Sequence, residues 1–183
     1  MFAIKNFQLQ KLRLDIKIFS EVKKILKFKS SLIIMIVFML FYANFSVFAA
    51  ITAEEREMFN LVNSARIERG LQPYTIDSEL AELARLKAED MVNLGYFAHH
   101  SPTYGSPFEM MKNFGINYNS AGENIAENRT IAGAHLALML SDSHKANLLS
   151  QRFSRIGIGI VNGPREFKTI VQMFIEPISQ PAK

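Results

Sequence analysis

Cysteine is absent from the 183 residues of the chain, so no disulfide can stabilise the fold and core packing must do so alone. Three common signatures of catalysis or phosphate binding are also missing, namely G-x-S-x-G, H-E-x-x-H and the phosphate-binding loop. Histidine is scarce, with four residues in the whole chain. Because imidazole and carboxylate groups bind divalent metals and move protons near neutral pH, the surroundings of these few histidines matter most for function.

The first 49 residues form a segment unlike the rest of the chain. Eight basic and two acidic side chains occupy residues 1–30, and an apolar run from Leu32 to Phe41 follows. Compact residues then stand at the −3 and −1 positions of a cleavage site after Ala49, which is the pattern of a secretory signal peptide. An uncleaved N-terminal anchor is the alternative, because Ser31–Ala50 is about long enough to span a bilayer. Both interpretations predict that the remainder of the chain is exported, to the medium or the cell envelope. The protein would meet the membrane only through this segment, and only if the segment stays uncleaved.

The net positive charge of the chain, +4, comes from this leader. Removing its eight basic and two acidic residues from the 21 basic and 17 acidic residues of the chain leaves 13 and 15, a net charge of −2. No basic patch with interleaved aromatic residues follows, so we predict no nucleic-acid partner. Residues 50–178 are long enough for a single core and are predicted to form one monomeric domain, with residues 179–183 as a frayed tail.

Helical signals dominate the first part of this domain and strand signals the last part. Capping residues and apolar periodicity predict helices that begin near residues 53, 78, 107 and 131, and a short helix over 144–149. Alternating residues predict an antiparallel hairpin of Ile156–Val161 and Phe167–Ile175, and Ile116–Ala126 is a further candidate strand. Glycine at alternate strand positions indicates that a helix lies closely on the sheet. The aromatic residues predicted to fill the core include Phe97, Phe108, Phe114, Phe153 and Phe174.

Three short segments far apart in the chain contain three of the four histidines and one carboxylate. They are Phe97–Pro102, Gly122–Ile125 and Ser141–Leu149. The first is predicted as a loop whose geometry the proline restricts, and Glu123 lies between Gly122 and Asn124, outside any periodic pattern. His144 is predicted at the start of a helix with Ser143 as its N-cap, a position that favours the neutral imidazole.

Each of these residues also has an ordinary interpretation when taken alone. His99, His100 and His144 have the character of exposed histidines, and Glu123 that of a solvated glutamate. The fourth histidine, His135, is interpreted as a structural residue of its helix. A Ser/His/acid triad that uses Ser101 stays open as well, although no motif positions it.

Considered together, the segments resemble the CAP superfamily, which includes cysteine-rich secretory proteins, venom antigens and plant pathogenesis-related proteins. The similarity is greatest to its cysteine-free, secreted bacterial branch and extends from about Glu57 to Ile175. It rests on motifs that occur together in order: L-V-N-x-x-R from Leu61, F-x-H-x-S-P from Phe97, A-G-E-N-I-A from Ala121, S-x-x-H-K-x-N-L-L from Ser141, I-G-I-G from Ile156, and Q-x-F from Gln172.

The resemblance implies an α+β fold, a three-layer α-β-α sandwich with a small antiparallel sheet between helices. It also implies a cleft that carries His99, Glu123 and His144, with Ser101, Asn124 and Gln172 beside them. These first three residues are its implied catalytic groups and its implied ligands for a divalent metal, zinc or a similar ion. Two neutral imidazoles would leave coordination positions open for water or a ligand.

The chain departs from the bacterial pattern at four positions. Ala132 and Gly133 stand where acidic residues are usual, Leu138 where tryptophan is usual, and Val171 where threonine is frequent. The expected site is therefore poorer in carboxylates than the two-histidine, two-acid set of the family. We expect only modest metal affinity from it.

Three functions are compatible with these features. The first is a binding or interaction role toward an extracellular ligand or an envelope component, with a metal-binding cleft. The second is a metal-dependent hydrolase of peptide or cell-wall substrates, in which Glu123 would accept the proton of a metal-bound water. The third is a carrier of lipid or another small apolar ligand, which would need a deep apolar groove. The first is the leading interpretation, because fold analogy alone assigns no activity.

Overall fold

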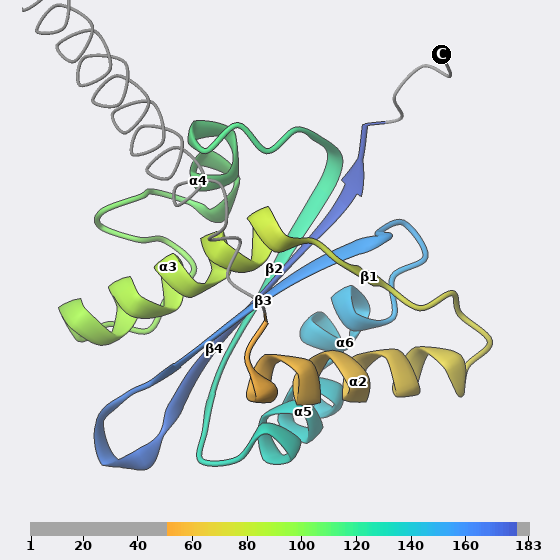
Figure 1. Cartoon of the computed structure of the whole chain (residues 1–183), viewed down its shortest axis with the longest axis horizontal. Coiled ribbons are helices and arrows are strands. Elements are labelled where there is room, and N and C mark those ends of the chain that lie inside the picture. The colour runs from red at the N-terminus through yellow and green to blue at the C-terminus, as the bar shows by residue number, and fades with distance from the viewer. Residues whose placement is uncertain (1–50, 179–183) are drawn as a thin grey trace, which may run out of the picture. The chain divides into compact units, whose positions relative to one another are not determined.

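A four-stranded sheet forms the middle layer of the structure, a computed structural model that describes residues 51–178 (Figure 1). The strand order is β1 (Thr75–Ile76), β3 (Arg155–Asn162), β4 (Lys168–Pro177) and β2 (Tyr118–Asn128). β1 and β3 run parallel, whereas the β3–β4 and β4–β2 pairs are antiparallel. β2 is therefore an edge strand. The predicted leader and the predicted frayed tail lie outside the described residues.

Helices cover both faces of this sheet, which confirms the predicted three-layer α+β architecture (Figure 1). One face carries α2 (Ala53–Ile67), α5 (Ile131–Leu140) and α6 (Asp142–Leu148), and the other carries α3 (Ser78–Leu94) and α4 (Pro107–Asn113). Along β4, Ile170 and Phe174 join the first core, and Val171, Met173 and Ile175 join the second. This alternation follows from the two-residue period of a strand. Within residues 51–178, no helix has the length and apolarity needed to cross a membrane.

The predicted strands are confirmed with small shifts. The hairpin is β3 and β4, joined through the 3-10 turn η1 (Pro164–Glu166), and its register pairs Ile156 with Phe174 and Ile160 with Ile170. The candidate strand near Ile116 is β2, displaced by two residues. β1 was missed because two residues are too few to show any periodicity.

Helix boundaries follow the capping chemistry of the sequence. Thr52 and Ser106 form capping boxes, and Asp77 and Thr130 cap α3 and α5 through their side chains. Gly95 ends α3 in the left-handed conformation, with φ of 69°. The prediction was wrong at α6. This helix begins at Asp142 with Ser141 as its N-cap residue, so Ser143 lies inside the first turn.

Three of the five phenylalanines predicted for the core lie at the surface. Phe97, Phe108 and Phe114 are 46%, 47% and 51% exposed. Methionines take their place, because Met91, Met110, Met111 and Met173 fill the space between α3, α4 and the sheet. These unbranched side chains adapt well to irregular gaps. Phe153 and Phe174 are buried as predicted, with ring centroids 5.8 Å apart.

The backbone of α3 lies directly against two glycines of β3. A Cβ atom built on Gly157 would stand 2.2 Å from the carbonyl carbon of Leu80, and one built on Gly159 would stand 2.2 Å from that of Ala84. Leu80 and Ala84 are about one turn apart on α3, and Gly157 and Gly159 are two residues apart on β3, so the helix runs along the strand. The close approach predicted from the I-G-I-G pattern is confirmed, and any side chain at these glycines would force α3 away from the sheet.

We predict that Gly159→Ala destabilises the domain by about 1–3 kcal/mol or more, because the added methyl meets backbone atoms that no side-chain rotation can move. Gly163→Ala is the matched control, since its nearest atom is the Phe167 carbonyl oxygen at an ordinary 3.4 Å. Urea denaturation of both variants measures the difference. Equal free energies of unfolding would show that α3 is free to shift.

Candidate functional site

The edge strand β2 carries Glu123, which lies within the candidate strand Ile116–Ala126 predicted from the sequence. The Gly122-Glu123-Asn124 segment lacks alternating apolar residues, so the sequence alone did not show which face of the sheet Glu123 occupies. In the structure Glu123 pairs with Met173 of β4, and its side chain is only 2% exposed. Adjacent strand residues point to opposite faces, so Glu123 lies toward α3 and Asn124 toward α6.

The carboxylate of Glu123 contacts the imidazole of His99. The distance from His99 Nδ1 to Glu123 Oε1 is 2.7 Å, and the His99 side chain remains 54% exposed. This contact fixes the orientation of the ring and leaves its Nε2 free of the carboxylate. Burial raises the pKa of Glu123, while the hydrogen bond from His99 and the charge of Lys87 act in the opposite direction. The second oxygen of Glu123, Oε2, is buried without a hydrogen-bond partner among the described residues.

His144 approaches from the other layer, as the third residue of α6. Its Nδ1 lies 2.9 Å from the Ser141 hydroxyl, and its carbonyl oxygen accepts a 3.1 Å hydrogen bond from Asn124 Nδ2. Burial and, secondarily, repulsion from the charge of His99 lower the pKa of His144. The lowered pKa favours the neutral form of the ring, which is the form that can ligate a metal or accept a proton.

Asn124 and Gln172 form a buried polar network between β2, β4 and α6. Both residues are fully buried. Asn124 Nδ2 donates to Gln172 Oε1 at 3.2 Å, and Asn147 Nδ2 donates to Asn124 Oδ1 at 2.9 Å. This network ties α6, and with it His144, to the edge strand that carries Glu123.

Comparison with known proteins identifies the family. The family model described as "CAP: Cysteine-rich secretory protein family" matches residues 59–174. The chain belongs to the CAP family. The matched range runs from within α2 to within β4 and includes all three segments of the site, so the domain observed here is a CAP domain.

Individual relatives agree with this assignment. The uncharacterized protein YkwD of Bacillus subtilis is 46% identical over 114 residues, which cover 62% of this chain and 44% of YkwD. The crystal structure of an extracellular protein containing a SCP domain, from Bacillus anthracis, has a TM-score of 0.62 and 28% identity over 70% of this chain and 45% of that one. The structure of an outer surface protein of Borrelia burgdorferi has a TM-score of 0.64 and 19% identity over 70% of this chain and 96% of that one. The chain thus covers less than half the length of YkwD and of the B. anthracis protein.

In this CAP domain, the loop that carries His99 is held by two residues of α3 that the sequence prediction missed. Lys87 is 1% exposed, and its Nζ donates to the His99 carbonyl oxygen at 2.8 Å. The sequence could have indicated this role, because Lys87 is a charged residue between Leu83 and Met91 on the apolar stripe of the helix. A charged residue at a core position of a helix needs a polar partner, and here the partner is the loop.

Asp90 is the second anchor of the loop. It accepts hydrogen bonds from the hydroxyls of Ser101 and Thr103, both at 2.6 Å, and from that of Tyr96. Burial alone would raise the pKa of Asp90, but these hydrogen bonds outweigh it and the pKa is lowered. Ser101, expected beside the cleft, is buried, and its hydroxyl oxygen also accepts from the amides of Thr103 and Tyr104. Its contacts are those of a residue that shapes the loop.

The L-V-N-x-x-R motif of the CAP domain also has a scaffolding role. The Asn63 side chain exchanges two hydrogen bonds with the backbone of Tyr74, at 2.8 and 3.0 Å. Arg66, 2% exposed, donates to the carbonyl oxygens of Gln72, Leu148 and Ser150. Both residues connect α2 to chain segments that flank the sheet.

The structure therefore brings His99 and Glu123 into contact, and the charge of His99 contributes, after burial, to the lowered pKa of His144. We call these three residues the histidine site. In residues 51–178, no group of three or more His, Cys, Asp and Glu side chains is arranged to hold a metal ion. The potential donors are the Nε2 atoms of the two imidazoles, while Glu123 is engaged by His99.

We predict that His99→Ala raises the pKa of His144 toward its ordinary value, because the repulsion disappears while burial remains. The change is measured by NMR titration of the imidazole proton resonances. His100→Ala is the control and should leave the pKa of His144 unchanged.

The lowered pKa of His144 also makes the stability of the domain depend on pH. Because the pKa of His144 is lower in the folded than in the unfolded state, its contribution to the free energy of unfolding is fully present above the unfolded-state pKa. That contribution is lost as the pH falls through the folded-state pKa. An identical His144 pKa in wild type and His99→Ala would contradict the proximity of the two rings.

Proposed function

We propose that this chain is an exported CAP-domain protein with a binding role, and that the histidine site is where it binds. A divalent metal ion, zinc or a similar ion, is the first ligand we propose for it. The observation that carries this proposal is the 2.7 Å contact between His99 Nδ1 and Glu123 Oε1. The biological partner we propose is an extracellular ligand or a component of the cell envelope.

The contact supports metal binding for a chemical reason. A metal-bound histidine commonly gives its other ring N–H to a carboxylate, which fixes the tautomer and the ring orientation. Glu123 is in position to be that acceptor, and its burial excludes competing water. His144 adds a second imidazole whose lowered pKa favours the deprotonated form that ligates. When bound, the ion would supply Lewis acidity to a ligand that completes its coordination.

The donor set favours binding over hydrolysis. Catalytic zinc sites use three protein ligands and keep one open position. Here two imidazoles are available, and Glu123 would have to leave His99 to become either a ligand or a base. Ala132, which stands where the family pattern has an acid, is exposed on α5 and offers no oxygen. We therefore place the hydrolase second and expect weak metal affinity.

We predict that zinc binds more tightly at about pH 7.5 than at about pH 5.5, because both imidazoles must be deprotonated to ligate. Isothermal titration calorimetry should show binding by the wild type and none by a His99→Ala/His144→Ala variant. Glu123→Gln should weaken binding by about 10–100-fold, the usual cost of losing a carboxylate that orients a metal-bound histidine.

Two outcomes of this experiment separate the candidate functions. Equal zinc binding by the wild type and the double variant would remove both the metal site and the hydrolase. Turnover of peptide, ester or glycan substrates by the zinc-loaded wild type, lost in Glu123→Gln, would place the hydrolase first. His100→Ala serves as the matched control, because His100 neighbours His99 in the loop without contacting Glu123.

Export is the second part of the proposal. It is supported by the basic and apolar leader and by the description of the B. anthracis relative as an extracellular protein. We predict that protein recovered from the culture medium begins at Ala50 or within a few residues of it, as measured by N-terminal sequencing. Recovery of only the full-length chain, in the membrane fraction, would favour the uncleaved anchor.

A further inference from the structure

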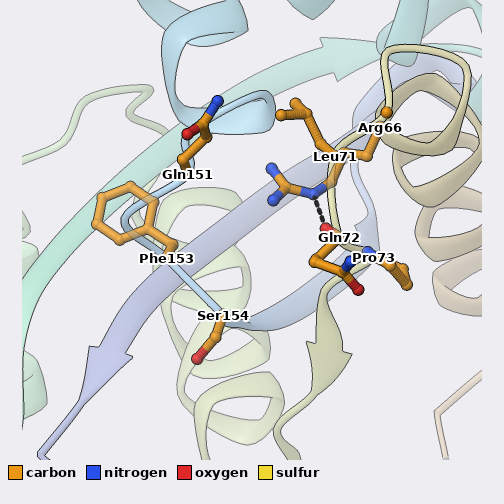
Figure 2. Close-up of a pocket in the computed structure, with 8 residues that line it drawn as sticks. Arg66, Leu71, Gln72, Pro73, Gln151, Phe153 and Ser154 are labelled. Atoms are coloured by element: carbon orange, nitrogen blue, oxygen red, sulfur yellow. Dashed lines mark hydrogen bonds between the residues drawn. The ribbon is translucent and has the colours of Figure 1, made fainter.

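A cavity of about 460 Å³ lies beside the loop that follows α2 (Figure 2). Its lining residues come from the end of α2, from the segment leading to β1 and from the segment between α6 and β3. They are Arg66, Gly70, Leu71, Gln72, Pro73, Gln151, Phe153 and Ser154. None of them belongs to the histidine site. We call this hollow the Arg66 cavity.

The guanidinium of Arg66 points into this cavity with part of its hydrogen-bonding capacity unused. Figure 2 shows the group between the Gln72 and Phe153 walls. Nε donates to the Gln72 carbonyl oxygen at 2.8 Å, and Nη1 donates to the carbonyl oxygens of Leu148 and Ser150 at 2.8 and 2.9 Å. These bonds use three of the five N–H groups of an arginine. The two N–H groups of Nη2 meet no acceptor within residues 51–178.

No formal negative charge faces Arg66 in the described part of the chain. No Asp or Glu carboxylate there forms an ion pair with it, although the residue is only 2% exposed. The ring of Tyr74 lies 3.5 Å from the guanidinium carbon and makes a cation–π contact with it, but burial raises the pKa of Tyr74 to about 12, so the phenol adds no full negative charge. Carbonyl oxygens supply only partial negative charge. A buried cation in this state is stabilised by an anion that reaches it.

The other residues that line the cavity indicate what kind of anion would fit it. Leu71, Pro73 and Phe153 offer apolar surface, and Gln72, Gln151 and Ser154 offer polar groups near the opening. The volume is within the range typical of small-molecule sites, and larger than a bare inorganic ion needs. A ligand that matches both features has a carboxylate at one end and an apolar group at the other.

We propose that the Arg66 cavity binds a small carboxylate that carries an apolar group, with the carboxylate on Arg66 Nη2 and the apolar group against Leu71, Pro73 and Phe153. Two sources share this chemistry, the C-terminal residue of a peptide and a free aliphatic acid. The site is separate from the histidine site and does not depend on metal.

Matched probes test the ligand chemistry with the exported domain. By calorimetry or NMR titration, N-acetyl-phenylalanine should bind at least about tenfold more tightly than its C-terminal amide, because only the acid offers charge to the guanidinium. Octanoate tests the free-acid source, and binding of either acid supports the proposal. Equal binding of acid and amide, or binding of inorganic phosphate as tight as that of either acid, would overturn it.

Variants at the rim avoid disturbing the buried arginine, whose removal would also break the fold. Gln151 is exposed, so Gln151→Glu should weaken acid binding about tenfold and Gln151→Lys should strengthen it, with unchanged thermal stability. The His99→Ala/His144→Ala variant should bind the acid like the wild type, which separates this test from that of the histidine site. Identical affinities for the Gln151→Glu and Gln151→Lys variants would show that the probe binds elsewhere.

Discussion

The contact between the backbone of α3 and the glycines of β3 is the constraint on which the rest of the structure depends. With no side chain at Gly157 or Gly159, the helix lies on the sheet at a fixed height and along a fixed direction. Lys87 and Asp90 are later residues of the same helix, so their positions above the sheet are determined by this contact. They in turn hold the loop that presents His99 to Glu123. The position of the His99 loop therefore depends on packing within about two helical turns of the residues that hold it.

The edge position of β2 is what would allow residues from both layers to share the site proposed above. An internal strand would separate a residue on the α3 face from one on the α6 face by the thickness of the sheet. At the edge, the loop after α3 and the start of α6 can approach each other past Glu123. The Asn124–Gln172–Asn147 network fixes α6 to this strand through side-chain amides. The Gln172 Nε2 group of this network is buried without a hydrogen-bond partner among the described residues, so the network is satisfied only in part.

The helices and strands could be predicted because their signals are local, whereas the three-layer α-β-α arrangement was expected from the family resemblance. Capping residues at Thr52, Asp77, Ser106 and Thr130, and the alternation in β3 and β4, depend on neighbours in the sequence. The predictions that were wrong concern features that contacts between distant parts of the chain determine. Nothing local shows that methionines fill the α3–α4 core in place of Phe97, Phe108 and Phe114, or that Glu123 pairs with Met173 and contacts His99. The proximity of His99 to Glu123 came only from family resemblance, since no spacing rule relates residues 24 apart.

Because the chain has no cysteine, hydrogen bonds and ion pairs connect the distant segments of this domain where other exported proteins use disulfides. Glu55 with Arg85, Asn63 with Tyr74, and Arg66 with the end of α6 connect distant segments by hydrogen bonds and charge. Such connections form and break reversibly, and their strength does not depend on the redox potential of the surroundings. A chain that crosses a membrane unfolded can therefore complete this fold on the far side without an oxidant or a disulfide isomerase. The domain should reach the same native state in a reducing compartment as in an oxidising one.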